Sequence, residues 1–111
     1  YEMAAGSGMT LALDSRRIPV EKKALELARE GIIPGGAYNN RGYLQDFVEI
    51  APTVSLELSD VLYDPQTAGG LLIALPEHKA PELLRRLEEW TGDARMIGYA
   101  RPFDGKSIRV K

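Results

Sequence analysis

Apolar residues recur at helical spacing in two long stretches of the chain. The first, residues 21–30, follows a proline suited to a first helical turn and precedes a glycine suited to a helix end; its apolar stripe comprises Val20, Ala24, Leu27 and Ala28. The second, Glu77–Trp90, sets a leucine-rich stripe against a charged side, and Pro81 falls near its first turn, where proline is tolerated. Both stretches are predicted to be amphipathic helices. Residues 55–62 show the same spacing over a shorter length and predict a short helix.

Short apolar runs between turn residues predict the strands. The predicted strands are residues 9–13, 47–50, 71–75, 94–100 and 107–110. Leu71–Leu75 is apolar without alternation, so it is expected to be the central strand, covered on both faces. The Asp104-Gly105 step is typical of a hairpin turn between the last two strands.

The remaining segments are predicted to be a helix end and a long loop. Tyr1–Ala5 reads as the last turn of a helix, broken at Gly6, whose start lies upstream, which indicates a fragment of a longer protein. Ile32–Gln45 contains a proline, three glycines and an Asn-Asn-Arg triplet, and is predicted to be a loop that is functional or mobile. We therefore expect residues 1–111 to form a single α+β domain, with helices packed on one mixed, largely antiparallel sheet.

Composition excludes several classes of site without identifying a function. The chain has 111 residues, 44% hydrophobic and 27% charged, with a formal net charge of −2. This balance is typical of a globular protein and gives no electrostatic reason to expect nucleic acid or an anionic membrane as a partner. Cysteine is absent and histidine occurs once, which excludes disulfides, thiolate catalysis and zinc sites built from cysteine within these residues.

The stretch from Asp64 to Ile73 concentrates the candidate chemistry. Its sequence is Asp-Pro-Gln-Thr-Ala-Gly-Gly-Leu-Leu-Ile, so a polar turn passes through two glycines into an apolar run. Glycines allow a ligand to approach the backbone closely, and the amides around Thr67 could form an anion-binding nest. Asp64 could bind magnesium, accept a proton or simply cap the turn. A tight polar turn without any ligand remains the alternative interpretation.

Two stretches resemble signatures of the selenophosphate synthetase family. Asp64–Leu72 resembles the family sequence Asp-Pro-Gln-Thr-Ser-Gly-Gly-Leu-Leu, except that Ala68 replaces the family's serine. Ile33–Arg41 resembles a second signature, in which a Pro-Gly-Gly turn is followed four residues later by an asparagine, here Asn40. The lead-in residues 1–5 and 11–14 also resemble the segment that follows a Gly-rich stretch of the family, which is absent from this sequence.

The resemblance implies the fold and the reaction. It implies the C-terminal part of a two-domain enzyme, truncated at its N-terminal side, with a fold like the C-terminal domain of aminoimidazole ribonucleotide synthetase. The family converts ATP, selenide and water into selenophosphate, AMP and phosphate in the presence of Mg²⁺. The resemblance also implies a homodimer, a cytoplasmic location and the chain's own N-terminal domain as a partner.

The resemblance also implies where this chain could contribute. The nucleophilic cysteine or selenocysteine, its lysine and the magnesium-binding aspartates belong to the upstream part of the family, so no catalytic or metal residue is assigned here, and the chain alone is expected to be inactive. It would form a wall of the active-site cleft, with the residues that contact ATP or an anion being Asn40, Asp64, Gln66, Thr67, Gly69 and Gly70. The alternatives are a non-catalytic dimerisation or interaction module of the same fold and another ATP-using member of the superfamily.

Overall fold

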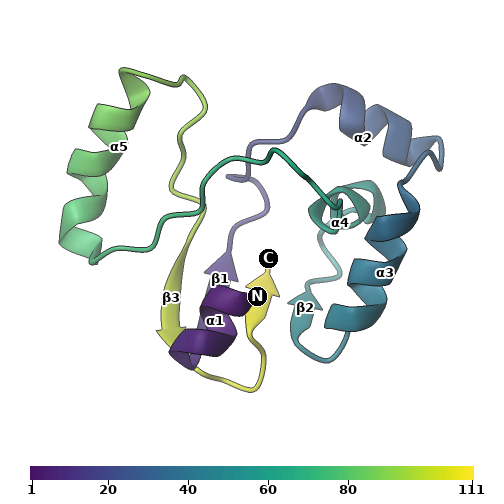
Figure 1. Cartoon of the computed structure of the whole chain (residues 1–111), viewed down its shortest axis with the longest axis horizontal. Coiled ribbons are helices and arrows are strands. Elements are labelled where there is room, and N and C mark those ends of the chain that lie inside the picture. Colours follow the sequence, from purple (N-terminus) through teal and green to yellow (C-terminus); the bar gives the residue numbers. More distant parts are fainter.

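A four-stranded mixed sheet forms the centre of the computed structural model, which describes all 111 residues (Figure 1). The strand order is β2-β4-β1-β3. β1 (Met9–Leu13) pairs antiparallel with β3 (Gly98–Pro102) and parallel with β4 (Ile108–Val110), and β4 pairs parallel with β2 (Val48–Ile50). The α+β class and the mixed sheet are confirmed. Two of the three strand pairings are parallel, so the expectation of a largely antiparallel sheet is wrong.

The turn at Asp104-Gly105 does not close a hairpin. β3 and β4 both pair with β1, which lies between them, so they do not pair with each other. The buried hydroxyl of Thr10 on β1 holds the connection, because its oxygen accepts from the Asp104 amide at 3.1 Å and lies 2.5 Å from the Lys106 carbonyl. Gly105 has φ +99°, a left-handed conformation that favours glycine.

The helices predicted from apolar spacing are present, and so is the helix end predicted at the start of the chain. α1 (Glu2–Ser7) continues past Gly6, where a break was expected, and ends at Gly8. α2 (Lys22–Arg29) precedes Gly31, and Gly8 and Gly31 have left-handed φ values of +63° and +77°. α4 (Leu56–Leu62) begins after Ser55, whose hydroxyl accepts from the Leu58 amide at 3.4 Å. α5 (Ala80–Glu88) follows a short 3₁₀ turn, η1 (Glu77–Lys79).

The predicted loop at Ile32–Gln45 is wrong, because α3 (Gly35–Leu44) occupies most of it. Glycine in a helix interior costs roughly 1 kcal/mol relative to alanine, so the glycines of this segment argue locally against a helix. Contacts between α3 and the region around α4, described below, outweigh that local preference.

The predicted central strand at Leu71–Leu75 is also wrong. The segment has no regular secondary structure, and Leu71, Leu72 and Ile73 are 92%, 50% and 46% exposed. The centre of the sheet is instead taken by β1 and β4, which each have a partner on both sides. A continuous apolar run in a sequence favours a buried segment, but it does not determine which strands pair.

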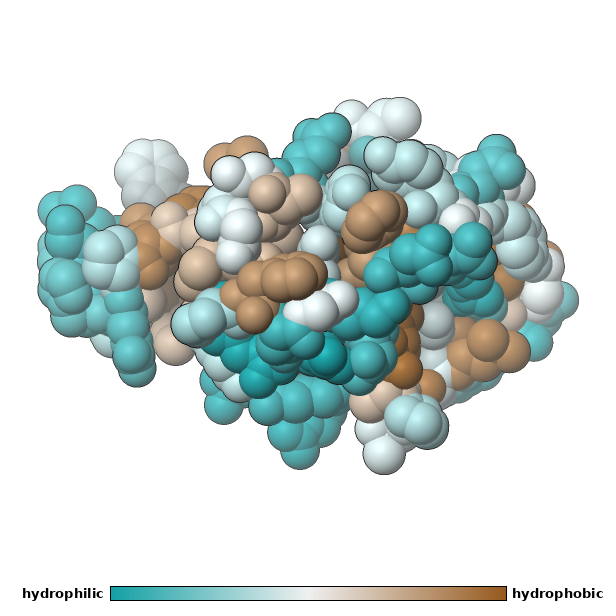
Figure 2. All heavy atoms as spheres, turned by 90° about the horizontal axis from the view of Figure 1, so that it is seen from below, coloured by the Kyte–Doolittle hydropathy of each residue, from teal (hydrophilic) through white to brown (hydrophobic).

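The buried residues are few and lie in two places, around β1 and β4 and among α2, α3 and α4, where Ala28, Ala37 and Asp60 are buried. The buried residues include Ala4 of α1, Thr10, Leu11 and Ala12 of β1, and Val110 of β4. α5 stands apart at one end, joined to the body by two extended segments (Figure 1), and its charged outer side is seen in Figure 2. The chain contains no helix with the length and apolar character needed to cross a membrane.

Candidate functional site

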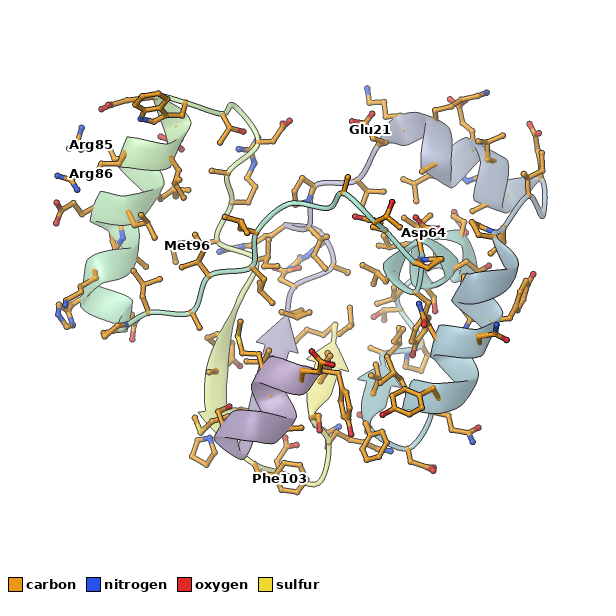
Figure 3. All side chains as sticks on the ribbon, in the orientation of Figure 1. Glu21, Asp64, Arg85, Arg86, Met96 and Phe103 are labelled. Carbon is orange, nitrogen blue, oxygen red and sulfur yellow. The ribbon has the colours of Figure 1, made fainter.

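The two stretches with family-like sequences meet where α4 ends. The side-chain amide of Asn40, on α3, donates from Nδ2 to the backbone carbonyl of Tyr63 across 2.9 Å. Tyr63 follows the last residue of α4 and directly precedes Asp64. Figure 3 shows Asp64 at this exit from α4. α3 therefore contacts the start of the Asp64–Gly70 loop, and Asn40 is hydrogen-bonded to the residue that directly precedes Asp64.

A second contact between the same elements involves Gly36 and Pro65. A Cβ atom added at Gly36 would lie 2.7 Å from Cγ and 3.2 Å from Cβ of Pro65. The proline ring is rigid and cannot rotate away from such an atom. Gly36 therefore allows α3 to lie directly against the Asp64-Pro65 step, which explains why a helix carries glycine at this position.

Arg41 joins α3 to α4 rather than projecting toward a free ligand. Its guanidinium donates to Ser59 Oγ at 3.1 Å and forms an ion pair with Asp60, whose side chain is 9% exposed. The same guanidinium lies 5.1 Å from the centre of the Tyr63 ring. Burial raises the pKa of the Tyr63 phenol, and the charge of Arg41 partly opposes that effect.

Asp60 and Tyr63 are structurally important residues that the sequence analysis did not identify. Asp60 lies within the short helix α4, and an aspartate on such a helix is usually solvated. Its burial depends on Arg41, 19 positions earlier in the chain, so neither residue carries a local signal of the pair.

The loop after Pro65 is exposed and holds few internal contacts. Gln66 donates its backbone amide to the Asp64 carbonyl at 2.8 Å, whereas the amides of residues 67–70 donate no hydrogen bond within the chain. Gln66, Thr67, Gly69 and Gly70 are all exposed. The loop therefore presents consecutive free N–H donors, which are the groups that bind an oxyanion in a backbone nest.

The chain itself does not require glycine at positions 69 and 70. Neither residue has a positive φ. A Cβ at Gly70 would meet nothing within 4 Å, and one at Gly69 would lie 3.0 Å from the flexible end of the Gln66 side chain. A Gly-Gly step can serve an unusual backbone conformation or the close approach of a ligand. The geometry of residues 69 and 70 is compatible only with the close approach of a ligand.

Two cavities lie elsewhere on the molecule. One of about 740 Å³ is lined mainly by apolar residues of β1, β3 and the Leu72–Leu75 segment. The other, of about 620 Å³, lies beside Arg16, Arg17 and Arg95. None of the six predicted site residues lines either cavity, so the predicted contact region is an exposed loop supported by α3 and not the wall of either cavity.

No metal site is formed by this chain alone. Histidine, aspartate and glutamate side chains do not converge in any group of three or more that could hold an ion. Asp64 offers one carboxylate at the loop, whereas Mg²⁺ usually binds one or two carboxylates together with ligand phosphates and water. The residues present therefore do not fit a complete magnesium site.

Comparison with known proteins finds relatives that are named as selenide, water dikinases. A selenide, water dikinase from Clostridium botulinum (strain Eklund 17B / Type B) is 49% identical over 111 residues, which are 100% of this chain and 32% of that protein. The selenide, water dikinase of Clostridioides difficile (strain 630) is 38% identical over 110 residues, or 98% of the chain and 32% of the relative. That of Caldanaerobacter subterraneus subsp. tengcongensis is 49% identical over 89 residues, which are 80% of this chain and 26% of the relative. No family model matches the chain.

The chain spans about a third of the length of the curated relatives it matches. Identity of 36–49% across almost all of its residues makes it homologous to a part of the selenide, water dikinases. The resemblance identified from the two sequence signatures is therefore confirmed.

Proposed function

We propose that this chain forms the C-terminal part of a selenide, water dikinase that converts ATP, selenide and water into selenophosphate, AMP and phosphate. The observation that carries the proposal is 49% identity over all 111 residues to a relative with that name. The contact between the two signature-bearing segments adds support, because residues 33–41 and 64–72 would then act at one place.

Within that enzyme, the Asp64–Gly70 loop contacts ATP or an anionic reaction product. Its free backbone amides and the Thr67 hydroxyl supply donors for phosphate oxygens, and the two glycines leave the backbone open to close approach. Gln66 can donate from its side-chain amide. Asp64 lies beside these donors and would orient the loop or a magnesium-bound phosphate, with the remaining metal ligands supplied by the rest of the enzyme.

The remaining properties of the proposed enzyme lie outside this third of its length. The nucleophile and most magnesium ligands would come from the N-terminal domain, which would also be this chain's closest partner. A homodimer in the cytoplasm is part of the same proposal. The chain by itself would bind nucleotide weakly and catalyse nothing.

A non-catalytic interaction module of the same fold is the second candidate. The exposure of Leu71, Leu72 and Ile73 favours it, because exposed apolar side chains at one place are typical of a contact surface. In that case the loop would tolerate substitution without any effect on ATP use.

The test is the Gly70→Ala variant of the complete enzyme. The added methyl group meets no atom of this chain, so the unfolding temperature should be unchanged, whereas selenide-dependent AMP formation from ATP should fall roughly 10- to 100-fold because a ligand loses its close approach. Gly92→Ala, at another open and exposed glycine, is the matched control. Full activity of Gly70→Ala would contradict the proposed role of the loop. Absence of the reaction in the unmodified enzyme would overturn the function itself.

A further inference from the structure

The start of the Asp64–Gly70 loop is a helix end whose last carbonyl requires a partner. At the end of α4, the Asp60 carbonyl accepts from the Tyr63 amide at 3.2 Å and the Val61 carbonyl accepts from the Asp64 amide at 3.1 Å. The carbonyl of Tyr63, the residue that follows the last residue of α4, accepts from Nδ2 of Asn40. A side chain from α3 thus supplies a hydrogen bond to the residue that ends α4.

Asn40 and Gly36 act from one face of α3. They are four residues apart in a helix, so they lie one turn apart on the same side. Asn40 contacts the carbonyl before Asp64, and Gly36 lies against the residue after it. Together they hold the backbone on both sides of Asp64.

α3 is itself fixed relative to α4 by the next residue along the chain. Arg41 pairs with the buried Asp60 and lies over the ring of Tyr63. The loop beyond Pro65, in contrast, has only the hydrogen bond from Gln66 to Asp64. The position of the free amides of residues 67–70 therefore depends on where α3 holds Asp64 and Pro65, the first residues of the loop.

We propose that Asn40 is a positioning residue that sets the Asp64–Gly70 loop for ligand binding, and not a residue that contacts the ligand. This inference rests on the proposed function of the loop. It replaces the role that the sequence pattern indicated for Asn40: the side chain acts through the Tyr63 carbonyl, one residue before the loop, and leaves phosphate recognition to the loop amides.

The test combines hydrogen exchange with a double-mutant cycle in the complete enzyme. Asn40→Asp keeps the size of the side chain but removes the Nδ2 donor and faces the Tyr63 carbonyl with a second acceptor. Asn39→Asp makes the same change in charge at the exposed neighbouring position and is the control. If Asn40→Asp prevents folding, Asn40→Ala is measured in its place, because it removes the donor without adding charge.

A positioning role predicts three results. The hydrogen-bonded amides of Asp64 and Gln66 should exchange faster in ligand-free Asn40→Asp than in the unmodified enzyme, and Asn39→Asp should not change them. The loss in kcat/KM should be roughly 10- to 100-fold. Combining Asn40→Asp with Thr67→Ala should cost little more than the greater of the two single losses, because both act through one loop.

Other outcomes separate the two proposals. Unchanged loop exchange in Asn40→Asp, or losses that multiply with those of Thr67→Ala, would overturn positioning and assign Asn40 to the ligand or to an unrelated role. If Thr67→Ala and Gly70→Ala both retain full activity, the proposed function of the loop fails, and the positioning role fails with it. Altered exchange without any loss of activity would reduce Asn40 to a purely structural helix-end contact.

Discussion

Asn40 lies 2.9 Å from the carbonyl oxygen of Tyr63, and this hydrogen bond joins two segments that are 23 residues apart in the chain. The bond connects α3 with the end of α4 and so places the Pro-Gly-Gly segment beside the Asp-Pro-Gln-Thr loop. The sequence similarity to selenide, water dikinases covers both segments. Their contact gives a physical reason for the two patterns to occur together, because one segment supports the other.

The close approach of Gly36 to Pro65 predicts the effect of a single methyl group. Gly36→Ala should lower the free energy of unfolding by about 1–3 kcal/mol, because the proline ring or the helix must move to remove the clash. Chemical denaturation measures the change.

Gly42→Ala is the matched control for Gly36→Ala. It lies in the same helix, where an added Cβ meets nothing within 4 Å, and should raise the free energy of unfolding by about 0.5–1 kcal/mol. An equal gain in stability from both variants would show that the α3–Pro65 contact is absent in solution.

The ion pair between Arg41 and Asp60 should stabilise the protein more than surface pairs do. Asp60→Asn leaves a partly buried guanidinium without its counter-charge, and we expect a loss of about 1–3 kcal/mol; the 35% exposure of Arg41 keeps the value below that of a fully buried pair. Glu89→Gln removes the exposed partner of Arg85 and should cost less than about 0.5 kcal/mol. Thermal or urea unfolding of both variants tests the difference.

Asp104 predicts a specific dependence of stability on pH. Burial alone would raise the pKa of its carboxyl group, but hydrogen bonds from Arg109 and Thr10 outweigh burial and hold the pKa below 3.8. A carboxyl whose pKa is lower in the folded state stabilises the fold above its unfolded pKa, and that contribution is lost as the pH falls through the folded value.

The difference in unfolding temperature between the unmodified protein and Asp104→Asn should therefore be constant near neutral pH and shrink below about pH 4. Asp93→Asn, at an exposed aspartate, is the control and should show no such change. If the difference in unfolding temperature did not shrink below about pH 4, the charge on Asp104 would not contribute to stability.

Local sequence patterns were sufficient to predict those helices whose apolar stripes and end residues lie within the helix or next to it. α2 and α5 carry apolar stripes with suitable ends, so spacing alone predicted them. α3 was missed because its glycines are locally unfavourable and its stability comes from Pro65, Asp60 and Tyr63, which lie 18 or more positions further along the chain. Leu71–Leu75 was predicted as a strand because its apolar run is typical of a buried segment. The run alone does not show whether another strand is present to pair with it.

The candidate site was predictable only in part. The composition of residues 64–70 indicated a loop with donors and glycines, and the structure adds that its amides are free and that its glycines are sterically unnecessary within the chain. The link from Asn40 to the Tyr63 carbonyl had no local signal, because an asparagine is compatible with a turn, a ligand contact or a helix-end contact.

Hydrogen exchange of residues 66–70 in the complete enzyme, with and without an ATP analogue and Mg²⁺, tests the central claim most directly. If the free amides of this loop bind a phosphate, their exchange should slow at least about tenfold when the nucleotide is present, and Gly70→Ala should reduce that protection. Unchanged exchange in the loop at a nucleotide concentration that saturates the enzyme would contradict the account.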